Sequence, residues 1–205
     1  MISTIQHIIE SRTSVNHFQP NRRLGDEVIE SLVSQATKSP SAYNMQNWRF
    51  IVVQSDSAKV RLKSAAYEQQ KIVDASVAFI VCGTLAAHVQ LAAALQPCVE
   101  ANIMEQQMVD GWVALASSSH VGNPALQRDE AIRSASLAAM TLMLAAQGMG
   151  LGSCAMSGFD AMQVVREFGL SATELPVMIV VVGYPAAGNW PQKPRKALSE
   201  VISVV

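Results

Sequence analysis

Apolar residues recur at helical spacing over much of the chain, and short runs that are apolar at every position separate these stretches. Spacings of three and four residues predict the helices. One of them begins near Gly25–Asp26 and ends before Pro40, because the residue before a proline disfavours helical backbone. The other predicted helices cover 2–10, 56–67, 97–118, 129–147 and 160–168.

Four short apolar runs have the length and composition of strands. They cover 49–54, 76–84, 151–155 and 176–184, and the second and fourth are apolar on both faces, which is typical of central strands. The last residues, 199–205, have the pattern of an edge strand. Helices outnumber strands and do not alternate strictly with them. The pattern therefore predicts an α+β fold, a central mixed and mostly antiparallel sheet wrapped by helices, in a single domain over 1–205.

Composition changes this picture in one respect. Half of the residues are hydrophobic and 15% are charged, so we expect the excess apolar surface to be buried in a homodimer. The net charge of −1 and the scattered basic residues argue against a nucleic-acid partner. No apolar run approaches the roughly 20 residues of a membrane span. An odd number of cysteines without paired spacing, and no visible secretory signal, lead us to expect a cytoplasmic protein.

Four polar segments interrupt the apolar pattern, at 11–16, 39–48, 150–160 and 193–196. Arg12, with hydroxyls beside it, offers a planar fork suited to phosphate, although a solvated helix end has the same composition. The amides of the second segment can donate and accept together, as the edge of a flavin ring requires, or can simply stabilise turns. Small residues in the third segment allow close backbone approach to a flat ligand. The fourth is a basic cluster that also fits a solvated tail.

Read together and in order, these segments resemble the nitroreductase family of flavoenzymes. The matching stretches are SRTSVNHF, SPSAYNMQNWRFIVV, GLGSCAMSGFD, VVVGYP and KPR, and they span nearly the whole chain. The resemblance implies an α+β sandwich that forms an intertwined homodimer with two identical FMN sites at its interface. It also implies NAD(P)H as the reductant and a C-terminal tail, about 185–205, that reaches the partner subunit.

Site residues follow from the resemblance position by position. Arg12, Thr13 and Ser14 match the family's phosphate-side motif, and Lys193 and Arg195 match a late basic pair that meets the same phosphate. Asn44 and Gln46 match a loop that the partner subunit donates to the isoalloxazine ring. The backbone of Ser157 and Gly158 matches the stretch that faces flavin N5. The complete set of expected cofactor-binding residues is Arg12, Thr13, Ser14, Asn16, Ser41, Asn44, Gln46, Met156, Ser157, Gly158, Lys193 and Arg195.

Three positions depart from the family's usual pattern. Asn16 stands where the family often has Lys or Arg near flavin N1 and O2, so its cation is lost or supplied from elsewhere. Asn47 replaces a proline before Trp48. Ser157 replaces a glutamate, which makes Met156–Asp160 similar to a less characterised branch of small reductases.

The expected activity is a ping-pong relay in which hydride passes from NAD(P)H through flavin N5 to a nitroaromatic, a quinone or a conjugated carbonyl. No side chain is expected to be an indispensable acid–base catalyst, and no metal site is expected. One alternative is a flavoenzyme specialised for an unsaturated acid or a small aldehyde. The other is a flavin-binding or purely structural dimer without physiological turnover.

Three competing interpretations are set aside. The glycines of 148–152 follow a helix, whereas a dinucleotide fingerprint follows a strand and opens a helix. The four histidines show no metal-ligand spacing, and Cys154 has no partner histidine in its own segment.

Overall fold

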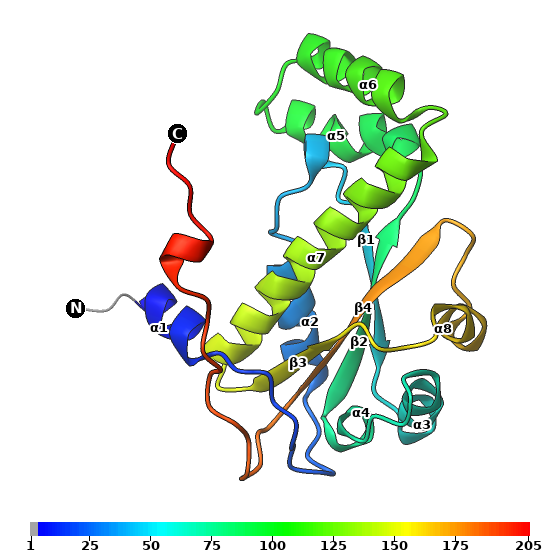
Figure 1. Ribbon diagram of the computed structural model, residues 1–205. Coiled ribbons are helices and arrows are strands. Elements are labelled where there is room, and N and C mark those ends of the chain that lie inside the picture. The colour runs from blue at the N-terminus through cyan, green and yellow to red at the C-terminus, as the bar shows by residue number, and fades with distance from the viewer. Residues whose placement is uncertain (1–3) are drawn as a thin grey trace.

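The computed structural model describes residues 4–205 and has a four-stranded sheet at its centre (Figure 1). The strands are β1 (Trp48–Val53), β2 (Val77–Thr84), β3 (Gly152–Met156) and β4 (Glu174–Gly183), in the order β1-β2-β4-β3. All three neighbouring pairs are antiparallel. The parallel pairing described in the chain is the isolated bridge between Ser14 and Ser153. The predicted α+β fold is confirmed, and the two runs that are apolar on both faces, β2 and β4, are the central strands.

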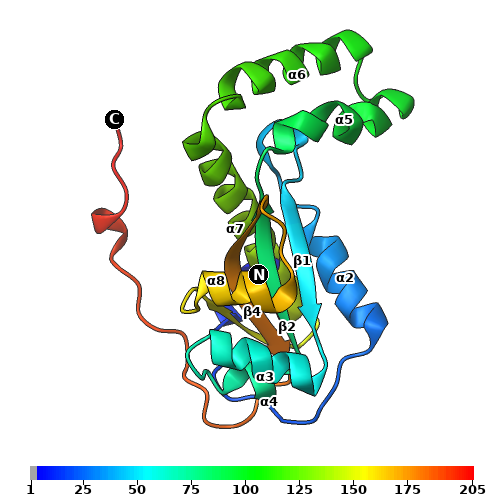
Figure 2. The ribbon, with the colours of Figure 1, turned by 90° about the vertical axis from the view of Figure 1, so that its right-hand side faces the viewer.

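Both faces of the sheet are covered by helices, which explains why β2 and β4 are apolar over nearly their whole length. Alternate residues of β2 point to opposite cores. Ala78, Ile80 and Cys82 pack on one face, under α3 (Asp56–Ala65), α4 (Lys71–Asp74) and α8 (Ala161–Phe168). Phe79 and Val81 pack on the other face, under α2 (Asp26–Ala36) and α7 (Pro124–Gly148). Figures 1 and 2 show these two layers on either side of the strands.

The helix predicted over 97–118 is wrong in its bounds. The structure has two helices there, α5 (Leu91–Glu100) and α6 (Gln106–His120), so Pro97 lies inside the first rather than at its start. The chain turns at Asn102, whose φ of 55° ends helical geometry. The next helix, α7, begins at Pro124 rather than Asp129, because the Asn123 side chain caps it by accepting from the Leu126 N–H at 3.1 Å.

A third core joins α5 and α6 to the loop before β1. Leu91, Leu95, Val109 and Ala116 are buried there with Met45. This loop contains the short helix η1 (Ala42–Asn44), and the short helix η2 (Ala87–Gln90) precedes α5. Figure 2 shows α5 and α6 as a unit that projects beyond the sheet.

The two ends of the described chain lie on one side of the molecule (Figure 1). Helix α1 covers Thr4–Ser11, while Ile2, the first residue of the predicted helix, lies outside the described residues. The edge strand predicted over 199–205 is wrong: the tail holds only the short helix η3 (Leu198–Glu200) and is exposed. Its apolar pattern meets no sheet edge within residues 4–205, and a strand forms only where another strand pairs with it. None of the described helices combines the length and the apolar character needed to cross a membrane.

Candidate functional site

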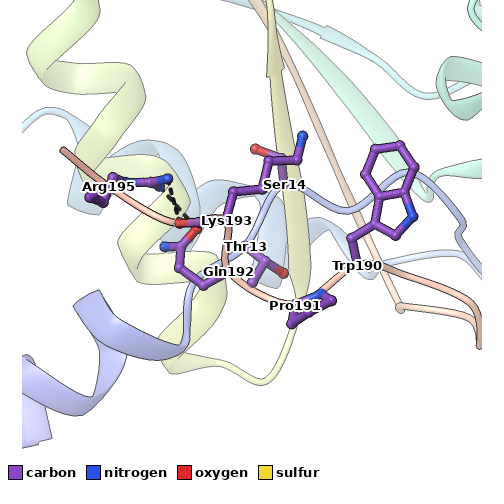
Figure 3. A pocket seen from close by; sticks show the side chains of 7 residues that line it. All are labelled: Thr13, Ser14, Trp190, Pro191, Gln192, Lys193 and Arg195. Atoms are coloured by element: carbon purple, nitrogen blue, oxygen red, sulfur yellow. Dashed lines mark hydrogen bonds between the residues drawn. The ribbon is translucent and has the colours of Figure 1, made fainter.

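A cavity of about 240 Å³ lies where the C-terminal tail crosses the segment that follows α1 (Figure 3). The lining residues are Thr13, Ser14, Trp190, Pro191, Gln192, Lys193 and Arg195. The structure thus brings together four residues predicted from opposite ends of the sequence: Thr13, Ser14, Lys193 and Arg195. Arg12, the fifth predicted phosphate-side residue, is not among the lining residues.

Two amide side chains hold the tail in this position. Asn189 Oδ1 accepts from the backbone N–H groups of Asn16 (2.7 Å) and His17 (3.0 Å), and Asn189 Nδ2 donates to the His17 carbonyl. Three residues further on, Gln192 Nε2 donates to the Arg12 carbonyl at 2.9 Å. The tail is therefore bound to the segment after α1 at two points that flank the cavity.

The basic residues of the cavity are held by contacts that leave their charge uncompensated. Lys193 Nζ lies 4.9 Å from the centroid of the Trp190 ring, a cation–π distance. Arg195 donates to the Lys193 carbonyl and to Gln192 Oε1, both at 2.9 Å. No carboxylate is present among the described residues that line the cavity. Two cations and two hydroxyls around such a space fit the phosphate of FMN.

A second polar cluster surrounds Lys71, at the start of α4. Its ammonium donates to Asn16 Oδ1 at 2.9 Å and to Cys154 Sγ at 3.6 Å. Asn16 follows the Ser14–Ser153 bridge, where the Val15 N–H donates to the Ser153 carbonyl at 3.0 Å. A lysine from another element thus places its charge beside the position at which the family often has one. Sequence reasoning missed Lys71; the available signal was the missing cation at Asn16.

The connection between α3 and α4 reaches the predicted N5-facing segment as well. Met156 is buried at the end of β3, and the next two residues, Ser157 and Gly158, are exposed. Gln69 Nε2 donates to the Gly158 carbonyl at 2.9 Å. The two residues before Gln69, Tyr67 and Glu68, have φ of 52° and 60°. Non-glycine residues in this conformation are uncommon and gather at functional sites.

The predicted ring-contacting loop has the same backbone feature. Tyr43, Asn44 and Gln46 have φ of 52°, 57° and 49°. The Ser41 hydroxyl accepts from the Gln46 N–H at 2.8 Å and so holds the turn closed. Asn47, which replaces the usual proline, is buried, and its carbonyl accepts from the Thr84 N–H.

A single chain does not bring this loop to the tail cavity. Asn47 shares a small pocket with Gln127, near the start of α7. Gln147, near the end of α7, donates a hydrogen bond from Nε2 to the Ser11 hydroxyl at 3.1 Å. Twenty helical residues separate the two glutamines, roughly 30 Å. The ring-contacting loop and the tail cavity therefore lie near opposite ends of α7, and Asn44 and Gln46 lie apart from Thr13 and Lys193.

Comparison with known proteins identifies the family of this chain. The model of the Nitroreductase family matches residues 9–184. YodC of Bacillus subtilis, provisionally named an NAD(P)H nitroreductase, is 35% identical over 176 residues, 86% of this chain and 87% of that protein. An enone reductase of CLA biosynthesis from Lactiplantibacillus plantarum is 26% identical over 87% of this chain and 84% of its own.

Among solved structures, a protein from Exiguobacterium sibiricum in complex with FMN superimposes with a TM-score of 0.91. It is 26% identical, and the match covers 99% of this chain and 98% of that one. Because the family model covers most of the chain and YodC exceeds 30% identity, this protein belongs to the nitroreductase family.

Proposed function

We propose that this protein is an FMN-dependent oxidoreductase that takes hydride from NAD(P)H and delivers it to a small electrophilic acceptor, as a homodimer with two shared sites. The observation that carries the proposal is the cavity formed by Thr13, Ser14, Lys193 and Arg195. It joins hydroxyls and cations from both ends of a family member's chain, in the composition that an FMN phosphate requires.

The residues around Lys71 would bind the ring of the same cofactor. FMN, when bound, supplies the hydride-carrying chemistry, and the protein binds it, orients it and tunes its electronics. The Lys71 ammonium, beside Asn16, would stabilise negative charge near flavin N1 and O2. Gln69 would fix the Gly158 peptide that approaches N5. Both substrates would use the same space in turn, which corresponds to a ping-pong mechanism.

The distance between the two halves of the site supports a dimer. Asn44 and Gln46 would complete the partner's site rather than their own, and the tail over 185–205 would lie against the partner. Apolar side chains that are exposed in the single chain are consistent with such an interface. On α6 and α7 these are Met108, Leu115, Leu137 and Met140.

The acceptor class is a nitroaromatic, a quinone or a conjugated carbonyl. The relative named as an enone reductase favours keeping conjugated carbonyls in this set. An enzyme specialised for one unsaturated acid or small aldehyde would show one dominant kcat/KM across an acceptor panel, whereas the broad activity proposed here would not.

The visible absorption spectrum of the purified protein tests the proposal. We expect an oxidised-flavin spectrum that bleaches when NADH or NADPH is added without oxygen and returns when an acceptor is added. A protein that stays colourless after FMN is supplied contradicts the flavin assignment. Bound flavin that neither nicotinamide reduces would instead favour a non-catalytic flavin-binding dimer.

A further inference from the structure

The Lys71 ammonium is held by an amide oxygen and a sulfur atom. Asn16 Oδ1 and Cys154 Sγ are its hydrogen-bond partners, and no ion pair of Lys71 occurs within residues 4–205. The carboxylate on the same short helix, Asp74, instead accepts from Gln70 Nε2 at 2.8 Å. Because no carboxylate of the described chain is bound to this ammonium, its positive charge can act on a bound ligand.

The geometry at Cys154 suits an acceptor role. Its thiol donates to the Ala155 carbonyl at 3.7 Å, which leaves the sulfur lone pairs for the Lys71 ammonium. The side chain is 4% exposed and belongs to β3, so its position is set by the sheet. The backbone of Asn16 is also held, because its N–H donates to Asn189 Oδ1 at 2.7 Å.

We propose that Cys154 and Asn16 are positioning residues that hold the Lys71 ammonium against the flavin pyrimidine edge and thereby raise the midpoint potential of the bound flavin. This inference rests on the proposed function. Its physical basis is that a long lysine side chain has many rotamers, and two acceptors select a single position, one on β3 and one on the segment that is bridged to β3. A cation fixed there favours the anionic reduced flavin over the neutral oxidised one.

A double-mutant cycle on the FMN-loaded protein tests the inference through the midpoint potential. Cys154→Ala should lower the equilibrium constant for flavin reduction about three- to tenfold, which for a two-electron couple equals roughly 15 to 30 mV in the negative direction. Lys71→Met should shift the potential further in the same direction. In the Lys71→Met background, Cys154→Ala should have no additional effect, because no ammonium remains to be positioned.

Two control variants separate positioning from general disturbance. Cys154→Ser keeps a small acceptor and should stay close to the wild-type potential. Cys98→Ala removes a half-buried thiol of α5 that lies outside this cluster and should leave the potential unchanged. If Cys154→Ala lowers flavin occupancy, the four proteins of the cycle (wild type, Cys154→Ala, Lys71→Met and the double variant) are compared by their dissociation constants for FMN. Cys154→Ala should then weaken FMN binding in the wild-type background and have no effect in the Lys71→Met background.

Equal shifts from Cys154→Ala in the wild-type and Lys71→Met backgrounds would overturn the inference, as would an unchanged potential in Cys154→Ala alone. Neither result affects the proposed function, since the wild-type flavin still bleaches with nicotinamide. A wild-type protein that binds no FMN defeats the proposed function and this inference together, and the wild-type spectrum reveals that case at once.

Discussion

The Ser41 hydroxyl accepts a hydrogen bond from the Gln46 backbone N–H at 2.8 Å, across a turn in which three residues have left-handed backbone. Such conformations cost free energy and persist only where the surrounding structure enforces them. The bond therefore holds Asn44 and Gln46 in the geometry in which the loop would meet a flavin ring.

We predict that Ser41→Ala raises the dissociation constant for FMN about fivefold. One neutral hydrogen bond is worth about 1 kcal/mol. Without it, ordering of the loop is opposed by its conformational entropy, and this cost reduces the free energy of FMN binding. Titration of the apoprotein with FMN, followed by quenching of flavin fluorescence, measures the change. Ser34→Ala, an exposed site on α2, is the control. Equal affinity in both variants would show that this turn does not prepare the flavin site.

The tail cavity makes a prediction about the phosphate group. Replacing both Lys193 and Arg195 with alanine should weaken FMN binding by about 100-fold or more, since each charge-assisted hydrogen bond is worth roughly 1.5–3 kcal/mol and the double variant loses two of them. Affinity for riboflavin, which lacks the phosphate, should hardly change. Isothermal titration calorimetry with FMN and with riboflavin, at two salt concentrations, measures the affinities of the wild type and the double variant.

Lys196→Ala provides the matched control, because Lys196 lies one residue beyond the cavity but does not line it. It should bind FMN like the wild type. If Lys196→Ala weakened binding as much as the double variant, the effect would reflect the charge of the tail as a whole. The cavity would then have no specific role.

The sequence predicted parts of the fold and of the candidate site for different reasons. Strands β2 and β4 were predictable because a strand buried on both faces must be apolar at every position. The meeting of Thr13 with Lys193 followed from the resemblance alone, since no local pattern links residues so far apart in the chain. The prediction of an edge strand over 199–205 was wrong because an apolar pattern does not say whether a sheet edge is within reach.

Other features depended on contacts that a linear pattern does not contain. Lys71 sits in a helix of four residues, too short for a periodic signal, and its importance comes from the approach of Asn16 and Cys154. The break between α5 and α6 occurs over Ala101–Glu105, which contains neither glycine nor proline, so Pro97 was the more obvious punctuation. Which chain supplies Asn44 and Gln46 is a property of the assembly.

Burial of His88 predicts that stability depends on pH. His88 and His120 stack with ring centroids 5.5 Å apart, and both are buried. Burial, and next the neighbouring His120, lower the pKa of His88 below its usual 6.5. The unfolded chain therefore binds more protons than the folded one as the pH falls below about 6.5. Stability contributed by neutral His88 is fully present above that pH and is lost as the pH falls toward the folded pKa.

His88→Gln should therefore flatten the pH dependence of unfolding between about pH 5 and 7. Urea unfolding at a fixed protein concentration, repeated across this pH range, measures the free energy of unfolding as a function of pH. His7→Gln, at an exposed position of α1, should keep the wild-type slope. A wild-type slope in His88→Gln would show that protonation of His88 is not coupled to folding.

Helix α7 lies so close to the sheet that only glycine fits between them at one point. A Cβ on Gly83 of β2 would meet the Ala131 carbonyl oxygen at 2.6 Å and its carbon at 2.7 Å. Both atoms are backbone, so a side chain cannot rotate away, and α7 itself must move. Gly83→Ala should destabilise the protein by about 1–3 kcal/mol. Gly111→Ala, in α6 with open space around it, should instead stabilise by about 0.5–1 kcal/mol, because alanine favours helix.

Denaturant unfolding of both variants at one protein concentration measures these opposite effects. The same variants separate stability from binding. Because Gln147 of α7 is bonded to Ser11, beside the tail cavity, a displaced α7 should also weaken FMN binding in Gly83→Ala. Gly111→Ala should bind FMN normally. A Gly83→Ala protein as stable as the wild type would mean that α7 does not lie this close to β2. The proposed coupling between the sheet, α7 and the segment around Ser11 would then be contradicted.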